Sequence, residues 1–258
     1  GPSMSFEACA ALVERADPLR FRAPMAAPVP ARQILFPLYA FNVEVARAPW
    51  VTQETMIAEM RLQWWRDALE EIAEGRTVRR HEVTDALAGV LDADGAHCLD
   101  GLIAARRWDI YKDPFEDQAH FDDYINATSG HLMFTAARLL GDTTEATVRD
   151  FAYGVGVASI FQALPALEAQ GRAPLIDGSD AGVEQLASTA ISRINTAARA
   201  RKTVSKLAGS GLVAGYHARP VLQKVLSNPA LVALDGLDTN PARDSLRFLN
   251  VSVRGWWR

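Results

Sequence analysis

The sequence predicts an all-α protein that folds as one domain, and three observations support this. Apolar residues recur at the 3.6-residue period of an amphipathic helix; Ile34, Leu38, Phe41 and Val45, for example, share one helical face. No alternating run of useful strand length interrupts that pattern. Glycines and prolines stand where helices should end, and the chain shows neither an internal repeat nor a low-complexity tract.

Composition is that of an ordinary globular protein. The chain has 258 residues, of which 49% are hydrophobic and 22% charged, and its net charge is −4. The absence of a basic stripe argues against nucleic acid as a partner. Cys9 and Cys98 lack metal-type spacing, so we expect a reducing, cytoplasmic location without a signal peptide or a membrane-spanning run. Residues 1–3 resemble a tag remnant, which leaves 4–258 as the expected single domain.

In the N-terminal third we expect a helix over 5–15, an extended arm over 20–30, and helices over 31–47 and 52–74. The arm is expected because each proline biases the residue before it away from helix. Pro49 separates the two long helices, and Thr52 should cap the second. The apolar stripe expected on that second helix consists of Ile57, Met60, Trp64, Ala68 and Ile72.

The remaining two thirds should also be helical. A turn is expected at 112–114, a loop at 171–182 and a flexible break at 209–211. Pro165 should kink or interrupt the helix that contains it, and Pro220 should bend another. The expected helices cover 82–91, 96–111, 122–140, 144–170, 183–207, 214–226 and 241–256.

Several motifs resemble the squalene/phytoene synthase family, the head-to-head prenyl transferases of the isoprenoid synthase fold. They are AFNVEVA at Ala40–Ala46, MRLQWW at Met60–Trp65, Tyr124 followed by Ser129-Gly130, and GVGVASIFQALPALEAQGRAPL at Gly154–Leu175. Within the family, the chain is most similar to the branch that includes a mitochondrial complex I assembly factor. The resemblance implies a helical bundle around a central cavity.

The resemblance also indicates what the chemistry would need. Active relatives hold Mg²⁺ between a prenyl diphosphate and carboxylates at i, i+4 on two facing helices. Here Ala46, Arg47 and Trp50 occupy the first motif, and Ala163 and Leu167 occupy the second. We therefore expect no metal site and no cofactor, with Mg²⁺ required only if the chain is an active prenyl transferase.

The residues expected around the cavity combine family positions and small or apolar residues. Tyr124 matches a tyrosine implicated in catalysis, but a half-buried structural aromatic is the alternative. The small residues of the Gly154–Ala158 run either allow close helix packing or leave space for a ligand. His131 is either a core histidine or a cavity residue. The expected cavity residues are Phe41, Val45, Ala46, Arg47, Tyr124, Gly130, His131, Gly154, Ala158, Gln162 and Arg172.

Two classes of function are compatible with these observations. The first is a non-catalytic member of the family that acts in assembly of respiratory complex I or binds a prenyl or lipid ligand. The second is a Mg²⁺-dependent transferase that condenses two prenyl diphosphates. The C-terminal segment SLRFLNVSVRGWWR mixes aromatic and basic residues, which suits either peripheral contact with the inner membrane or docking on the bundle.

Overall fold

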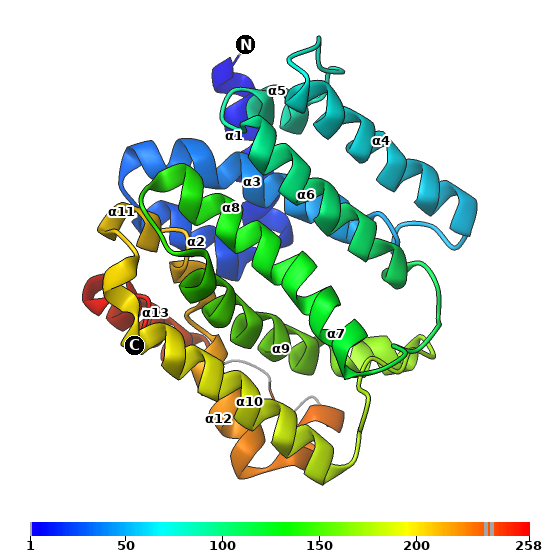
Figure 1. The fold of residues 1–258 in the computed structure, drawn as a ribbon, viewed down its shortest axis with the longest axis vertical. Helices are drawn as coiled ribbons and strands as arrows, with labels where there is room; N and C mark the ends of the chain where they lie inside the picture. Colours follow the sequence, from blue (N-terminus) through cyan, green and yellow to red (C-terminus); the bar gives the residue numbers. More distant parts are fainter. Residues whose placement is uncertain (1, 235–236, 238–239) are drawn as a thin grey trace.

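The computed structural model describes residues 2–234, 237 and 240–258, and within these ranges it contains α-helices, short 3-10 and π turns and no β-strand (Figure 1). The fold class is therefore the expected one. The long helices are α1 (Pro2–Ala16), α2 (Pro18–Ala26), α3 (Val29–Arg47), α4 (Thr55–Ala73), α6 (Ala93–Arg106), α8 (His131–Leu140), α9 (Glu145–Ala169), α10 (Asp180–Arg199), α12 (Ala218–Ser227) and α13 (Pro241–Arg254). Shorter helices are α5 (Glu82–Ala88), α7 (Gln118–Ile125) and α11 (Lys206–Gly209).

Two hydrophobic clusters form the core. One gathers apolar side chains of α1, α3, α4, α5 and α6, and the other those of α7, α9, α10 and α12. Helix α8 contributes to both, with Leu132 and Ala136 in the first cluster and Met133 and Ala137 in the second. This division follows from helical geometry, since neighbouring residues on one helix point about 100° apart. The candidate site lies where the two clusters meet.

The expected extended arm over 20–30 is wrong, because most of it is helix α2. Pro18 lies in the first turn, where its missing N–H costs nothing, and Asp17 caps the helix by accepting from the Arg20 N–H. Pro24 stands inside the helix but is buried together with Ala23. Tertiary burial thus outweighs the local bias that proline exerts on its predecessor.

Helix α4 presents a different face to the core from the one expected. Met60 is 65% exposed and Ile57 38% exposed, whereas Leu62 and Trp65 are buried. Of the expected stripe, Ala68 is buried as predicted. The other buried residues of the helix are Ala58, Leu62, Trp65 and Leu69, so the buried face is rotated from the expected one. Thr52 does not cap the helix. The helix begins at Thr55, and its N-cap residue is Glu54, whose side chain makes no capping hydrogen bond.

Other boundaries shift for local reasons. The expected helix over 122–140 is α7 and α8 joined by a π turn, η2 (Asn126–Gly130), and the one over 96–111 is α6 followed by a 3-10 turn, η1 (Arg107–Asp109). Pro165 lies near the C-terminal end of α9 and does not interrupt it. The expected helix over 183–207 ends at Arg199, before a 3-10 turn, η3 (Arg201–Thr203), and α11. The one over 214–226 begins at Ala218, after a 3-10 turn, η4 (Val213–Gly215).

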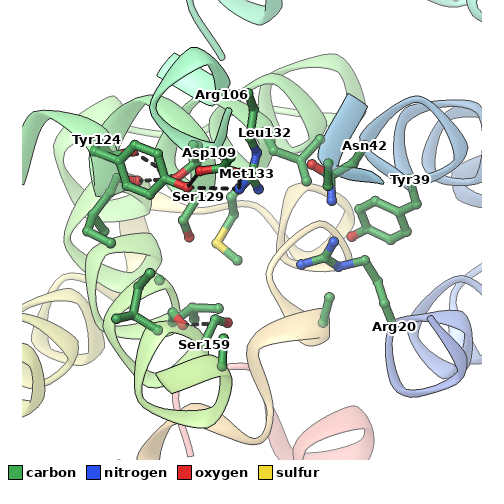
Figure 2. Close-up of a pocket in the computed structure, with 18 of the residues that line it drawn as sticks. Arg20, Tyr39, Asn42, Arg106, Asp109, Tyr124, Ser129, Leu132, Met133 and Ser159 are labelled. Atoms are coloured by element: carbon green, nitrogen blue, oxygen red, sulfur yellow. Dashed lines mark hydrogen bonds and ion pairs between the residues drawn. The ribbon is translucent and has the colours of Figure 1, made fainter. Parts of the chain in front are cut away.

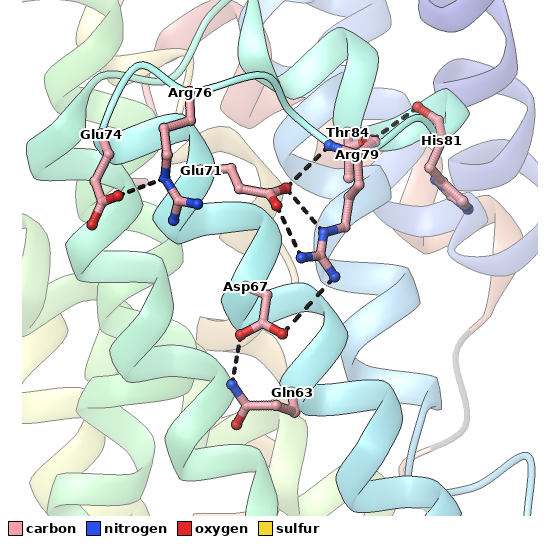
Figure 3. A network of polar contacts seen from close by, with 8 residues as sticks. All are labelled: Gln63, Asp67, Glu71, Glu74, Arg76, Arg79, His81 and Thr84. Carbon is pink, nitrogen blue, oxygen red and sulfur yellow. Dashed lines mark hydrogen bonds and ion pairs between the residues drawn. The ribbon is translucent and has the colours of Figure 1, made fainter.

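A polar network fixes the connection between α4 and α5 (Figure 3). Glu71 accepts hydrogen bonds from the backbone N–H of Arg79 at 3.1 Å and from its guanidinium at 2.9 and 3.0 Å. These bonds lower the pKa of Glu71 to about 2. Thr84 donates to the Arg79 carbonyl at 2.7 Å, which anchors the loop to α5. The acidic residues here are paired with arginines and serve as a structural clasp.

Helix α9 is long and apolar enough by composition to cross a membrane, although no such run was expected from the sequence. In the fold, 61% of its apolar window is buried. It packs against α10 and contributes Phe151, Val157 and Phe161 to the core. Burial inside the bundle therefore accounts for its hydrophobicity.

Candidate functional site

A cavity of about 300 Å³ lies between the two hydrophobic clusters (Figure 2). Helices α3, α6, α7, α8 and α9 surround it, with the η1 and η2 turns and one residue of α2. Ser159 and Ala163 of α9 line the cavity and are exposed to solvent, so the cavity is open. Its volume is at the lower end of the roughly 300–1,000 Å³ typical of small-molecule sites.

The polar centre of the cavity is a triad of Asp109, Tyr124 and Arg106 (Figure 2). The Tyr124 hydroxyl donates a short hydrogen bond to one carboxylate oxygen of Asp109. Arg106 donates from one nitrogen to the other Asp109 oxygen and to the Tyr124 hydroxyl oxygen, both at 3.0 Å. The carboxylate is therefore already neutralised by a cation and bound by a hydroxyl.

Burial determines the protonation states in this triad. It raises the pKa of Tyr124 well above its ordinary value, and the facing Asp109 raises it further. Burial alone would lower the pKa of Arg106, but Tyr124 and Asp109 outweigh that effect and the net shift is upward. The tyrosine thus remains a protonated donor and the arginine a fixed cation.

The residues around the cavity do not fit a pair of Mg²⁺ ions. Magnesium prefers carboxylate oxygens, with water and substrate oxygens completing an octahedron. Among the described lining residues Asp109 supplies the one carboxylate, and its two oxygens face Arg106 and Tyr124. No group of three metal-ligating side chains occurs in the described ranges of the chain.

The π turn η2 shapes one wall of the cavity. Thr128 donates from its hydroxyl to the Tyr124 carbonyl at 2.7 Å, and Ser129 donates to the Ala152 carbonyl of α9 at 2.6 Å. Both residues line the cavity. π turns within helices are frequent at functional sites because they re-aim the side chains that follow. Nothing in the local sequence signalled this turn.

Basic and aromatic side chains complete the polar part of the lining. The Arg20 guanidinium lies 5.4 Å from the centre of the Tyr39 ring, and both residues line the cavity. Two buried donor atoms on lining residues, Arg106 Nε and Trp108 Nε1, have no acceptor within the described structure. Buried donors of this kind are costly unless an oxygen meets them.

The sequence-based expectations agree best with the cavity at the positions of the two acidic motifs. Ala46, Trp50, Ala163 and Leu167 all line the cavity. Ala46 lies on α3 and Trp50 in the turn that follows it, whereas Ala163 and Leu167 lie on α9. The positions where metal-binding carboxylates were expected in an active relative thus face the cavity and carry no carboxylate.

Other expected cavity residues lie elsewhere. Phe41 is fully buried against Trp65, with ring centres 5.8 Å apart, and Val45 and Ala158 are also core residues. Arg47 points to the surface and pairs with Glu44 at 2.6 Å. Of the expected cavity residues, Ala46 and Tyr124 are the two that the cavity includes.

The expected cavity residues His131, Gly130 and Gly154 contact other parts of the fold. His131 Nδ1 lies 3.0 Å from Arg149, and burial followed by this cation lowers its pKa to about 4, as expected for a neutral core histidine. Arg149 and Asn126 also surround Gly130. Gly154 packs on Ile194 of α10.

Arg172 and Gln162 complete the comparison. Arg172 is buried near the cavity rim, donates to the Tyr111 carbonyl at 2.9 Å and stacks 5.4 Å from the Trp50 ring centre. Gln162 is half-buried on α9 outside the lining. The cations that do line the cavity, Arg20 and Arg106, were missed. Arg20 comes from the segment expected to be extended, and Arg106 and Asp109 flank a helix end that was expected later in the chain.

Fold and cavity together define a helical prenyl-synthase-like protein, and the sequence comparison agrees. The profile of the squalene/phytoene synthase family matches residues 13–175, and the chain belongs to that family. A relative from Drosophila melanogaster, "NADH dehydrogenase (ubiquinone) complex I, assembly factor 6 homolog", is 26% identical over 177 residues. The match covers 65% of this chain and 53% of that protein, so the chain spans about half the length of its curated relative.

Two solved structures share the fold. A dehydrosqualene synthase, crystallised in complex with a ligand, superposes with a TM-score of 0.78 at 16% identity and covers 98% of this chain and 97% of that one. The squalene synthase HpnC from Alicyclobacillus acidocaldarius gives a TM-score of 0.71 at 16% identity, over 86% and 92% of the two chains. At this identity the likeness confirms the fold.

Proposed function

We propose that this protein is a non-catalytic member of its family that acts by binding, and that it serves the assembly of respiratory complex I. The observation that carries the first half is the cavity lining. The motif positions Ala46, Trp50, Ala163 and Leu167 line the cavity without a carboxylate, and Asp109, the carboxylate among the described lining residues, is already paired. Without metal ions, the charge of a departing diphosphate lacks its main stabiliser in such a site.

The cavity supports a single ligand with an apolar body and an anionic or oxygen-rich end. Its volume of about 300 Å³ suits one prenyl or acyl chain better than the two that a head-to-head condensation must hold together. Ile125, Leu132, Met133 and Val155 supply apolar lining. A chain buried there would gain about 0.8 kcal/mol per methylene. The Arg20 guanidinium, on a lining residue, supplies a cation for the polar end.

The assembly role is supported by the relative from Drosophila melanogaster, whose name states it. We place the protein in the cytoplasm at the surface of the inner membrane, where complex I subunits would be its partners. The test is deletion of its gene in the source cell, followed by measurement of NADH:quinone oxidoreductase activity and of assembled complex I on native gels. We expect both to fall and to return with the wild-type gene. Normal complex I after deletion would contradict the assembly role.

A matched pair of variants separates the cavity from the rest of the protein. Ala163 lines the cavity and Ala166 lies exposed on the same helix outside the lining. Ala163→Trp should fill the cavity, whereas Ala166→Trp should not. If a bound ligand is needed for assembly, the first variant fails to restore complex I and the second restores it. Full rescue by Ala163→Trp would remove the ligand from the proposal and leave a role in protein binding.

A further inference from the structure

A second and larger concavity lies beside the C-terminal end of α2. It has a volume of about 1140 Å³ and runs between the end of α2, the segment from η3 to Ser210 and the C-terminal end of α13. Figure 1 shows α11 and α13 at the same edge of the bundle. We call this second concavity the basic groove. It is lined by Ala23, Ala26, Ala27, Pro28, Arg201, Lys202, Val204, Ser205, Lys206, Leu207, Gly209, Ser210, Val213, Val251, Ser252, Val253, Arg254, Gly255, Trp256 and Trp257.

The charge of the basic groove has one sign. Arg201, Lys202, Lys206 and Arg254 line it, and among the residues that the structure describes no aspartate or glutamate does. None of the four forms an ion pair with a residue that the structure describes. The chain as a whole carries a net charge of −4 and contains four lysines, two of them here. Four cations gathered on an acidic protein create a local field that attracts anions.

Between these cations the groove is apolar. Val253 is 75% exposed and Leu207 39% exposed. The inner wall is formed by Trp256, buried against Phe151, and by Trp257, whose ring lies 5.5 Å from the Arg201 guanidinium. Exposed apolar side chains beside basic residues and tryptophan are typical of proteins that sit at a lipid–water interface.

The outer face of α13 extends this apolar surface. Phe248 and Val251 dock the helix on the bundle, and Arg247 donates to the Tyr216 carbonyl at 3.0 Å. Docking leaves Leu246 and Leu249 exposed at 69% and 58%. Together with Val253 they follow helical spacing and share one face. The helix is therefore packed on one side and apolar on the side that faces outward.

We propose that the basic groove binds an anionic phospholipid at a membrane surface, with an acyl chain against Val253 and Trp257 and the phosphate among the four cations. Charge complementarity selects an anionic occupant. The exposed leucines of α13 favour a bilayer over an acidic peptide, because they lie beside the groove and would enter the interfacial region as the groove binds its lipid. This inference rests on neither the cavity nor the assembly role.

The direct test is co-sedimentation of the full chain with lipid vesicles. We expect binding to vesicles that contain phosphatidylglycerol, loss of binding as salt rises, and little binding to pure phosphatidylcholine. Lys202→Glu/Lys206→Glu should weaken partitioning at least about twentyfold, since each cation near an anionic surface contributes roughly fivefold. The matched control is Lys112→Glu/Lys224→Glu, which changes the net charge equally at the two exposed lysines outside the groove.

A fluorescence experiment locates the contact. Phosphatidylglycerol with brominated acyl chains should quench tryptophan emission of the bound protein, and Trp257→Phe should remove most of that quenching. Trp50→Phe, which removes an exposed tryptophan outside the groove, should retain it. Equal binding to neutral vesicles, equal loss in the two lysine variants, or quenching that survives Trp257→Phe would each overturn the proposal. Failure to bind any vesicle would overturn it as well and favour an acidic protein.

Discussion

Asp109 determines how charge is distributed in the cavity, although it comes from a three-residue turn. Its two oxygens are used by Arg106 and Tyr124, so the lining presents donors to a ligand. This pairing also explains how a tyrosine at a catalytic position of the family can serve structure here. Tyr124 is buried, keeps its proton and orients the carboxylate.

The triad predicts a large stability effect from a single atom change. Asp109→Asn leaves the Arg106 cation buried without its counter-charge, which typically costs about 3–5 kcal/mol. Urea denaturation should show this loss, and Arg106→Met should cost a similar amount. The double variant Arg106→Met/Asp109→Asn should cost much less than the sum of the two, because no charge remains unpaired. Single variants within about 0.5 kcal/mol of the parent would show that the triad is not a coupled unit.

His131 predicts a pH dependence with a defined sign. Burial and Arg149 lower its pKa in the folded state to about 4, below the ordinary value of about 6.5. The unfolded chain therefore binds a proton more readily, and stability should fall as pH decreases from about 6.5 to about 4. His131→Gln should reduce this loss of stability, which is measured as the urea midpoint at each pH across the range. The substitution should not abolish the loss, because burial lowers the pKa of His217 to about 4 as well. An unchanged slope would contradict the assignment.

At the scale of helices, the sequence predicts where a helix forms better than it predicts which face of the helix is buried. Periodicity identified α3, α4 and α9, but on α4 the chosen stripe included Met60, which is 65% exposed, in place of Leu62. Both stripes obey helical spacing, and only the neighbouring helices decide between them. The η2 turn and the α2 helix depend likewise on tertiary contacts, so the residues they bring to the cavity, Ser129 and Arg20, could not be found from local pattern. The motif positions Ala46, Ala163 and Leu167 came from the resemblance to the family's acidic motifs, and the structure places all three in the cavity lining.

Helix α4 provides a test of which tryptophan belongs to the core. Trp65 is 5% exposed and meets Phe41 edge to face, whereas Trp64 is half-buried beneath the Arg79 guanidinium at 5.3 Å. Trp65→Ala should cost about 3–5 kcal/mol, comparable with the whole stability of many domains. Trp64→Ala should cost clearly less. A Trp65→Ala variant that melts within about two degrees of the parent would show that α4 packs differently.

Close packing of α9 against α10 depends on Gly154. A Cβ at Gly154 would lie 2.4 Å from Ile194 Cγ1 and 3.1 Å from the Ala190 carbonyl. Gly154→Ala should therefore destabilise by about 1–3 kcal/mol in thermal unfolding, through forced repacking of a buried isoleucine. Gly89→Ala, where the nearest atom is 3.5 Å away, should be close to neutral. If Gly154→Ala were equally neutral, the small-residue run would serve something other than helix packing.

At the scale of the whole molecule, the family architecture is kept while the charges that the chemistry requires are not. The bundle superposes on a dehydrosqualene synthase over 98% of the chain. Ala46, Trp50, Ala163 and Leu167, where the resemblance would put metal-binding carboxylates, line the cavity. The fold therefore keeps an open cavity, and we propose that it binds a ligand without metal.

The central claim is that this cavity binds without magnesium and does not ionise a diphosphate. The most direct measurement is a thermal-shift titration with farnesyl diphosphate, in Mg²⁺ and in excess EDTA, with inorganic diphosphate assayed in the same samples. We predict a ligand-dependent rise in melting temperature that follows mass action, is equal in both conditions, and is lost in Ala163→Trp. No diphosphate should be released above the protein-free blank. A shift that needs Mg²⁺, accompanied by diphosphate release, would contradict the account and identify an active prenyl transferase.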